Sequence, residues 1–283
     1  MDNARFVDRL HARIADVGSP TCIGLDPVIE RIPEEVRTKS SSVVDAVEQF
    51  CVGVIDATVD YASAFKPQSA CFERFGSAGV AVLERVTSHA RSVGVPVVLD
   101  AKRGDIGISA AHYAESVKAI GADAVTVNAY LGPSTVEPYL DAWLGVFVLV
   151  RTSNPDSDAV QSNELSSGGT VAEMMAAHVA QLGANRLGES GMSDVGAVVG
   201  LTKSADGVAL RGLMPTQYFL VPGYGAQGGG AEDLKPLLGA QGGVLVNASR
   251  SVLYPERVDG ESWQDSVARA AKAMHHDLAS VMI

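Results

Sequence analysis

Short apolar segments of strand length alternate with helical patterns along almost the whole chain, and this alternation recurs about eight times. Repeated strand-helix units favour a parallel sheet whose strands are covered by helices. Eight such units close naturally into a (β/α)8 TIM barrel, which commonly occupies about 250 residues as one domain. An open doubly wound sheet is less favoured, because no glycine-rich fingerprint follows the first predicted strand. We therefore predict an α/β fold with a single barrel domain over residues 1–283.

The predicted elements follow one another without a low-complexity linker or an internal repeat beyond the strand-helix unit. One polar connection, residues 154–169, is too long for an ordinary loop in such a fold and is a candidate lid or binding loop. The predicted strands are 21–26, 62–68, the apolar start of 96–106, 125–130, 146–153, 195–200, 218–223 and 243–248, and the predicted helices are 42–59, 78–93, 109–120, 134–143, 170–187, 203–212 and 262–281.

The acidic balance of the chain limits the partners that it can bind. Its formal net charge is -11, whereas a nucleic-acid-binding surface requires clustered basic residues. No apolar segment approaches the length of a membrane span, and the first residues form a charged amphipathic segment rather than a signal peptide. Cys22, Cys51 and Cys71 lack metal-ligand spacing and lie in apolar surroundings, which favours free thiols in a reducing compartment. We expect a cytoplasmic protein that binds neither nucleic acid nor membranes.

The third predicted strand ends in a dense group of charges. Residues 96–106 have the sequence Pro-Val-Val-Leu-Asp-Ala-Lys-Arg-Gly-Asp-Ile. An apolar run typical of a buried strand is followed there by Asp100, Lys102 and Asp105. Since side chains alternate along a strand, Asp100 and Lys102 should point to the same face, roughly 6 to 7 Å apart. Gly104 should free the backbone to turn and place Asp105 nearby. The pattern predicts a compact set of alternating charges at a strand end.

Other polar side chains occupy the equivalent position on their own strands. In a barrel the carboxyl ends of all strands open on one face, so these residues should contribute to a single site. All six histidines fall in predicted helices instead, which argues against a histidine base or a histidine-ligated metal. The residues at or just past strand ends are Asp26, Lys66, Asp100, Lys102, Asn128, Ser153 and Arg250.

A glycine-rich loop, residues 222–230, follows the seventh predicted strand, and Arg250 follows the eighth. Backbone amides that can approach closely beside a fixed cation are suited to phosphate, and barrels often bind phosphate at this position. A flexible surface turn has the same composition, and the charges at the other strand ends could form a structural ion-pair network. Buried charges are costly unless they are used or fully paired, so we favour a phosphate-binding active site.

Four short segments carry a resemblance to a known enzyme family. They are 24–27 (Gly-Leu-Asp-Pro), 65–68 (Phe-Lys-Pro-Gln), 100–106 (Asp-Ala-Lys-Arg-Gly-Asp-Ile) and 222–227 (Pro-Gly-Tyr-Gly-Ala-Gln). The third resembles the D-x-K-x-x-D-I signature of orotidine 5'-phosphate decarboxylase, and the others occur in that family's order, in its longer bacterial form. The resemblance implies a homodimeric enzyme that converts orotidine 5'-monophosphate to uridine 5'-monophosphate and carbon dioxide in pyrimidine biosynthesis. It implies no metal and no organic cofactor.

The same resemblance implies roles for individual residues. Lys66, Asp100, Lys102 and Asp105 would form an alternating Lys-Asp-Lys-Asp network, in which Lys102 protonates C6 of the pyrimidine ring. Asp105 would reach, together with Ile106, into the site of the partner subunit. Ser109 stands where the family usually has threonine, and it keeps the hydroxyl group. The substrate-binding residues would be Asp26, Ile106, Ser109, Ser153, Gly223, Gln227 and Arg250, with Asp26 and Lys66 on the ribose, Ser153 on the pyrimidine, and Gln227 and Arg250 on the phosphate.

Decarboxylation with Lys102 as the proton donor accounts well for the residue types, because the carbanion at C6 must be stabilised and then protonated. Three alternatives remain open from the sequence. A related barrel enzyme could decarboxylate or epimerise a sugar phosphate with a divalent metal. An aldolase-type enzyme could use Lys102 as a Schiff-base nucleophile, although neighbouring carboxylates should keep that lysine protonated. The chain could also be a non-catalytic phosphate-ligand sensor.

Overall fold

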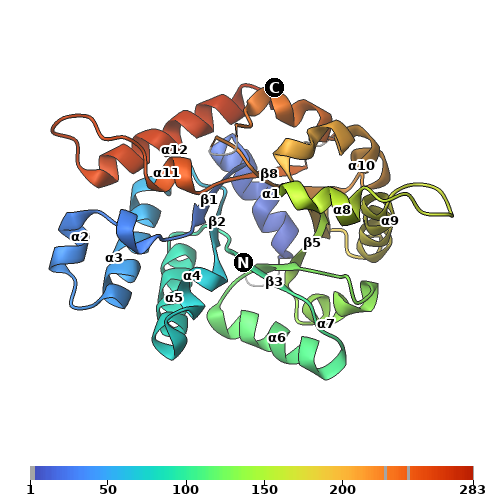
Figure 1. Cartoon of the computed structure of the whole chain (residues 1–283), viewed down its shortest axis with the longest axis horizontal. Coiled ribbons are helices and arrows are strands. Elements are labelled where there is room, and N and C mark those ends of the chain that lie inside the picture. Colours follow the sequence, from blue (N-terminus) through green and yellow to red (C-terminus); the bar gives the residue numbers. More distant parts are fainter. Residues whose placement is uncertain (1–3, 226–227, 241–242, 283) are drawn as a thin grey trace.

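The computed structural model of the chain describes residues 4–225, 228–240 and 243–282. Eight parallel strands lie in one sheet in the order β2-β1-β8-β7-β6-β5-β4-β3. Two isolated parallel bridges, Phe65 with Val97 and Gln68 with Asp100, bring the two edges of this sheet together. Helices surround the strands as an outer ring (Figure 1), so the predicted (β/α)8 barrel is confirmed.

The strands are buried along most of their length, because one face lines the barrel interior and the other packs against helices. Neighbouring strands keep a parallel register, with Cys22 opposite Ala64 and Val146 opposite Val195. Each predicted strand overlaps an observed one. The strands are β1 (Thr21–Leu25), β2 (Ala64–Pro67), β3 (Val98–Arg103), β4 (Ala124–Val127), β5 (Gly145–Arg151), β6 (Ser193–Val199), β7 (Gln217–Pro222) and β8 (Val244–Ala248).

Several helices begin at a side chain that caps the first turn. Ser42 accepts a hydrogen bond from the backbone N–H of Asp45, and Thr170 and Glu173 form a reciprocal capping box. The α-helices are α1 (Phe6–Val17), α2 (Glu34–Lys39), α3 (Val43–Thr58), α4 (Ser69–Glu73), α5 (Gly76–Ser92), α6 (Gly107–Ile120), α7 (Glu137–Asp141), α8 (Asp158–Gln161), α9 (Val171–Gly183), α10 (Gly207–Leu213), α11 (Arg250–Leu253) and α12 (Trp263–Ala279). The 3-10 helices are η1 (Ile29–Arg31), η2 (Pro133–Thr135), η3 (Pro155–Ser157), η4 (Leu201–Asp206) and η5 (Ala231–Leu237).

The structure differs from the predicted elements mainly in short helices that the sequence pattern did not indicate. Helices α2, α4 and α11 are too short to show a hydrophobic period in the sequence. The polar connection 154–169 also contains η3 and α8, and Pro155 begins η3 with a backbone angle that suits a first helical residue. Within the described residues, none of the helices combines the length and the apolar character that crossing a bilayer requires.

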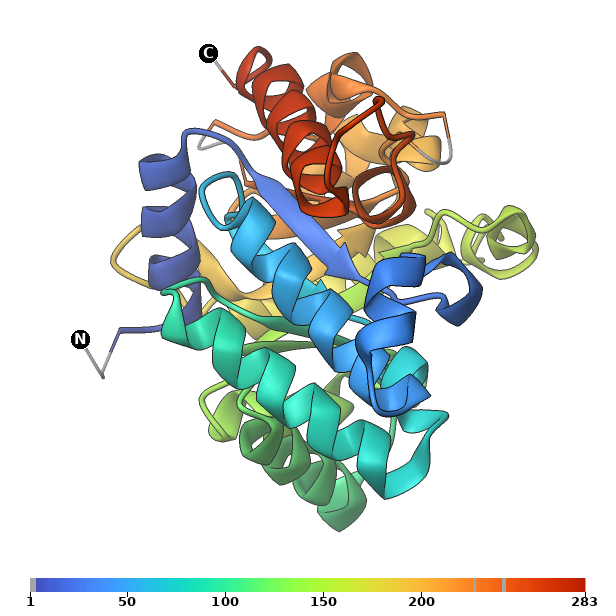
Figure 2. The same cartoon turned by 90° about the vertical axis from the view of Figure 1, so that its left-hand side faces the viewer.

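Helix α1 closes the amino-terminal end of the barrel. Phe6, Val7 and Leu10 are buried and belong to one apolar cluster with interior residues of the strands. Ion pairs fix the helix in place, because Arg5 contacts Asp194 at 2.8 Å and Arg9 contacts Asp123 at 2.6 Å. In Figure 2, α1 (dark blue) and the yellow-green segment that contains α8 lie at opposite ends of the barrel. The carboxyl ends of the strands therefore open away from α1.

Phe6→Ala should lower the free energy of unfolding by about 3 to 5 kcal/mol, which is the usual range for truncating a buried phenylalanine. The Phe6 ring meets the Phe147 ring edge-on with 6.1 Å between centroids, and a Cβ on Gly145 would lie 2.1 Å from it. Urea unfolding followed by circular dichroism measures the change. Val258→Ala truncates a side chain that is 62% exposed, so its effect should stay within about 0.5 kcal/mol. Equal effects of the two substitutions would contradict this role of α1.

Candidate active site

A cavity of about 580 Å³ opens at the carboxyl ends of the strands. Its volume lies within the usual range of about 300 to 1,000 Å³ for sites that bind small molecules. Its walls combine a group of charges on one side with apolar side chains on the other. The lining includes Lys66, Asp100, Lys102, Thr126, Asn128, Leu149, Ser153, Val160, Met175, Val198, Leu220 and Pro222.

Asp100 lies at the centre of the charged side of the cavity. Its Oδ2 accepts hydrogen bonds from Lys66 Nζ at 2.8 Å and from Gln68 Nε2 at 3.1 Å. Its Oδ1 accepts from Lys102 Nζ at 2.6 Å and from Thr126 Oγ1 at 2.9 Å. A carboxylate has about four acceptor positions, so this set of donors fixes both its ionised state and its orientation.

The pKa values of this group follow from its charges. Burial disfavours an ionised Asp100, yet Lys66 and Lys102 hold the pKa of this carboxyl well below its usual range. Burial likewise opposes the charge on Lys66, and the carboxylates of Asp26 and Asp100 raise the pKa of this amine above its usual value. The Lys66 side chain is buried, whereas the Lys102 side chain is 47% exposed at the cavity. Both lysines line the cavity, and Lys102 is the more accessible of the two to a bound molecule.

The end of β3 and the turn that follows it have backbone angles that the sequence did not indicate. Left-handed backbone occurs at Lys102, with φ of 47°, and at Gly107, with φ of 55°. Gly104 serves a close approach instead, because a Cβ there would lie 2.7 Å from the carbonyl oxygen of Asn128. Asp105 does not join the network around Asp100 within its own chain, and its Oδ1 accepts a hydrogen bond from the backbone N–H of Ile106 at 2.8 Å.

Several predicted site residues meet at the cavity. Lys66, Asp100, Lys102 and Ser153 all line it. Asp26 directly follows β1 and acts on the charge of Lys66. Asp26 does not itself line the cavity, and its buried Oδ1 atom has no hydrogen-bond partner among residues 4–225, 228–240 and 243–282, which leaves an acceptor of this carboxylate unsatisfied there.

The other predicted residues lie near the same end of the barrel but do not line the cavity. Ile106 and Ser109 are exposed on the connection from β3 into α6. Gly223 follows β7 with φ of 111°, and Arg250 begins α11 after β8 with an exposed side chain. Gln227, which the sequence assigns to a phosphate site, lies outside the described residues.

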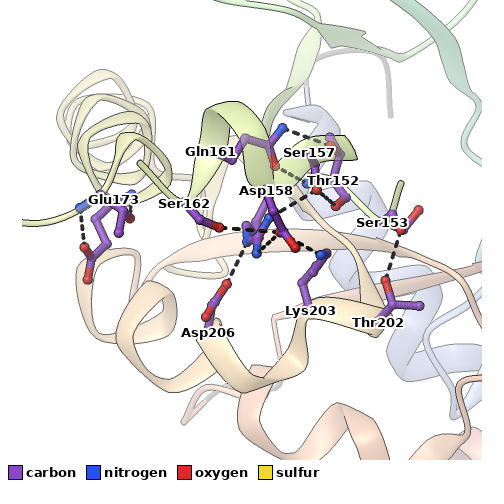
Figure 3. Close-up of polar contacts among 12 residues, drawn as sticks. Thr152, Ser153, Ser157, Asp158, Gln161, Ser162, Glu173, Thr202, Lys203 and Asp206 are labelled. Carbon is purple, nitrogen blue, oxygen red and sulfur yellow. Dashed lines mark hydrogen bonds and ion pairs between the residues drawn. The ribbon is translucent and has the colours of Figure 1, made fainter. Parts of the chain in front are cut away.

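The segment that contains η3 and α8 forms one wall of the cavity through Ser157, Val160 and Gln161. Arg151, at the end of β5, holds this wall in place by pairing with Asp158 of α8 and Asp206 of η4, each at 2.6 Å. Lys203 of η4 adds a second pair with Asp158 at 2.7 Å (Figure 3). These two cations lower the pKa of Asp158 to about 2. The predicted lid is thus tied by charge to the connection that follows β6.

Three residues of the site were not among the predicted ones, namely Gln68, Thr126 and Arg151. Gln68 stands inside a quoted motif, but its contact with Asp100 depends on how β2 meets β3. Thr126 interrupts the apolar strand β4 with a polar side chain, and Arg151 is the buried last residue of β5. A polar residue inside a buried strand needs a partner, and this was the one signal in the sequence that could have identified them.

The arrangement is suited to a small anionic molecule and to proton transfer. The Lys102 ammonium group faces the cavity and is held by a carboxylate that stays ionised, so it can stabilise a developing negative charge and donate a proton to it. In the part of the chain that the structure describes, no group of three or more His, Cys, Asp or Glu side chains is arranged to hold a metal ion.

The chain is similar to known proteins over most of its length. The model of the orotidine 5'-phosphate decarboxylase / HUMPS family matches residues 19–263. An orotidine 5'-phosphate decarboxylase of Rhodopirellula baltica is 39% identical over 96% of this chain and 98% of its own length. One of Paracidovorax citrulli is 42% identical over 90% of this chain and 92% of its own length. The solved structure of Leishmania donovani OMP decarboxylase has a TM-score of 0.77 at 32% identity, covering 96% of this chain and 99% of that one.

Lys66→Met should lower the free energy of unfolding at pH 7 by about 3 kcal/mol, because it leaves buried carboxylates with one cation fewer. In the wild type the lowered pKa of Asp100 gives a stabilising contribution that is complete above its unfolded value near 3.8 and is lost as the pH falls through the folded value. In the variant the pKa of Asp100 should rise above its unfolded value. The carboxyl group then takes up a proton at a higher pH than in the wild type, which removes the unpaired buried charge. The stability difference between the two proteins should therefore narrow as the pH falls from about 7 to 4.

Urea unfolding at several pH values measures this difference. Lys118→Met is the matched control, because Lys118 lies on α6 with an exposed side chain whose partner is Glu115 of the same helix. The control should have nearly wild-type stability throughout. A difference for Lys66→Met that stays constant or widens on acidification would contradict the proposed charge balance.

Proposed function

The chain belongs to the orotidine 5'-phosphate decarboxylase / HUMPS family, and from this premise we propose that it converts orotidine 5'-monophosphate to uridine 5'-monophosphate and carbon dioxide. Relatives that bear this enzyme's name match the chain over nearly its whole length. The observation that carries the proposal is the Lys66-Asp100-Lys102 network beside a cavity of suitable size. This network supports the proposal because it provides an accessible ammonium group at the cavity, as a cofactor-independent lyase that forms a carbanion would require.

Lys102 is the proton donor in the proposed reaction. The bond between C6 of the pyrimidine ring and its carboxylate breaks, the electron pair stays on C6, and carbon dioxide departs. The Lys102 ammonium group stabilises the negative charge on C6 and transfers a proton to it. The neutral amine then takes a proton from water, which restores the starting state.

Asp100 has two roles in this proposal. It holds the Lys102 ammonium group by a contact of 2.6 Å. It also places a fixed negative charge near the substrate carboxylate, so that like-charge repulsion in the bound substrate is relieved when carbon dioxide leaves. The four donors around Asp100 support this second role, because they keep the carboxylate ionised beside another anion.

The rest of the substrate is assigned to neighbouring strand ends. We assign the ribose hydroxyls to Asp26 and Lys66, and the buried Asp26 oxygen without a partner among the described residues supports this role. Ser153 lines the cavity and is assigned to the pyrimidine. Binding of the remote phosphate supplies energy for ordering the site around the reacting atoms. The phosphate contacts are assigned to Gly223, Gln227 and Arg250.

We propose that the enzyme is a homodimer whose subunits share their active sites. Apolar side chains are exposed at Ile106 after β3, at Ile108 in the first turn of α6, and at Tyr130 after β4, which is 81% exposed. The backbone N–H of Asn128 donates a hydrogen bond to the carbonyl oxygen of Arg103 at 2.7 Å, which holds the connections after β3 and β4 together. An exposed apolar patch of this kind indicates a binding surface. If a second copy binds at this patch, Asp105, Ile106 and Ser109 of the first copy would lie close to the cavity of the second.

We also propose a cytoplasmic location in a reducing environment. Cys22 and Cys51 are buried, Cys71 is half-buried, and all three are free thiols. Burial raises the pKa of Cys22 to about 12 and that of Cys71 to about 11. These thiols therefore stay protonated at neutral pH, which suits a structural role in apolar surroundings.

The purified protein should consume orotidine 5'-monophosphate in a spectrophotometric assay, with the same rate in EDTA as in magnesium. Lys102→Ala should lower kcat by about 10²-fold to 10⁴-fold or more, since it removes the general acid, while binding of uridine 5'-monophosphate stays close to wild type. Lys118→Ala, the control, should leave both unchanged. No turnover by the wild type, or turnover only after magnesium is restored, would refute the proposed reaction. Wild-type turnover by Lys102→Ala would refute its proton donor.

Shared active sites can be tested by mixing subunits. Lys102→Ala and Asp105→Asn should each be nearly inactive alone. After the two variants are unfolded and refolded together, about a quarter of wild-type activity should return, because half of the dimers are mixed and each mixed dimer has one intact site. If Asp105 serves its own subunit, every site carries one substitution and no activity returns. The recovered fraction thus decides between the two arrangements.

A further inference from the structure

Strand β3 is irregular at the residues that carry the charges. Leu99 pairs with Val125 and Arg103 pairs with Val127, so residues 100–102 lie opposite the single residue Thr126 of β4. Extra residues of this kind bend a strand and change the direction of its side chains. Lys102 has a left-handed backbone here, and this conformation costs about 1 to 2 kcal/mol for a residue other than glycine. Contacts around Lys102 must therefore stabilise this backbone conformation.

The hydroxyl group of Thr126 supplies the acceptor that the irregular strand lacks. Its Oγ1 accepts hydrogen bonds from the backbone N–H groups of Ala101 at 3.0 Å and Lys102 at 2.9 Å. In a regular ladder these N–H groups would find carbonyl oxygens of the neighbouring strand. Thr126 is only 1% exposed, so its hydroxyl group is placed by the protein rather than by solvent. The two N–H groups depend on this one side chain.

The same hydroxyl group also holds the carboxylate that pairs with Lys102. A hydroxyl has one proton to donate, and the proton of Thr126 goes to Asp100 Oδ1 at 2.9 Å. That oxygen is the one that accepts from Lys102 Nζ at 2.6 Å. One side-chain oxygen thus connects the backbone of Lys102 to the partner of its ammonium group. Thr126 therefore fixes the backbone of Lys102 directly and its ammonium group through Asp100.

We propose that Thr126 is a positioning residue that sets the place of the Lys102 ammonium group. The inference rests on the proposed function, in which Lys102 protonates C6. Thr126 acts on the reaction through Lys102 and Asp100. Without its hydroxyl group, two backbone N–H groups lose their acceptor and Lys102 is free to return to the ordinary backbone region, which moves Nζ away from Asp100. A displacement of about 1 Å at a catalytic group can reduce a rate about 10²-fold.

Thr126→Val keeps the branched shape and removes the hydroxyl group, so it should lower kcat by about 10²-fold with little change in KM. Thr126→Ser restores the hydroxyl group and should recover most of kcat. Thr58→Val is the matched control, because Thr58 is buried in α3 and its hydroxyl donates to Val54 O at 2.7 Å. It loses a buried hydrogen bond away from the cavity, so it should lower stability without lowering kcat.

Crystal structures of the wild type and Thr126→Val give a readout that does not depend on the reaction. In the variant, Lys102 should leave the left-handed region and its Nζ should no longer contact Asp100. If these two changes are observed but the wild type does not decarboxylate orotidine 5'-monophosphate, the positioning role is supported. Only the proposed function is then rejected. The positioning role is overturned if Lys102 keeps its conformation and contact in Thr126→Val. It is also overturned if Thr126→Val retains wild-type kcat, or if Thr126→Ser loses as much kcat as Thr126→Val.

Discussion

The ionised carboxylate of Asp100 is the constraint on which the active-site end of the barrel depends. A buried negative charge is strongly destabilising unless it is paired and hydrogen-bonded, and its donors here come from β2, from β3 and from β4. Each donor reaches the carboxylate only if its strand has the right register. The bridge between Gln68 and Asp100 is also one of the two that bring the sheet edges together, so barrel closure and the charge network involve the same residues.

The two ends of the barrel use charge in different ways. At the amino-terminal end, Arg5 and Arg9 pair with single carboxylates and hold α1 over an apolar interior. At the carboxyl end, Asp100 is shared by two lysines, and one of these remains accessible to a bound molecule. Ion pairs away from the cavity stabilise the fold, whereas a pair whose cation lies at the cavity leaves that cation available for chemistry. The division agrees with the general separation of stability and catalysis in such barrels.

The barrel and most of the charged site could be predicted from the sequence, because buried parallel strands read as apolar runs and charges at their ends are conspicuous. The left-handed backbone at Lys102 could not be predicted, since it arises from the register of β3 against β4 and from the hydroxyl of Thr126. The ion pair of Arg151 with Asp206 joins residues that are 55 positions apart, and no local sequence pattern indicates such a contact. The roles of Asp105 and Gln227 remain predictions, as the first concerns a second subunit and the second lies outside the described residues.

The way in which β2 and β3 pair limits how this barrel can evolve. The other neighbouring strands pair as ladders of several residues, some with a register shift, but these two are joined by isolated bridges and by the side-chain contacts of Lys66 and Gln68 with Asp100. A mutation that replaces Asp100 to suit another substrate would also weaken the closure of the fold. New activities on this scaffold are therefore more accessible through the walls of the cavity, such as the segment that contains η3 and α8, than through its charged centre.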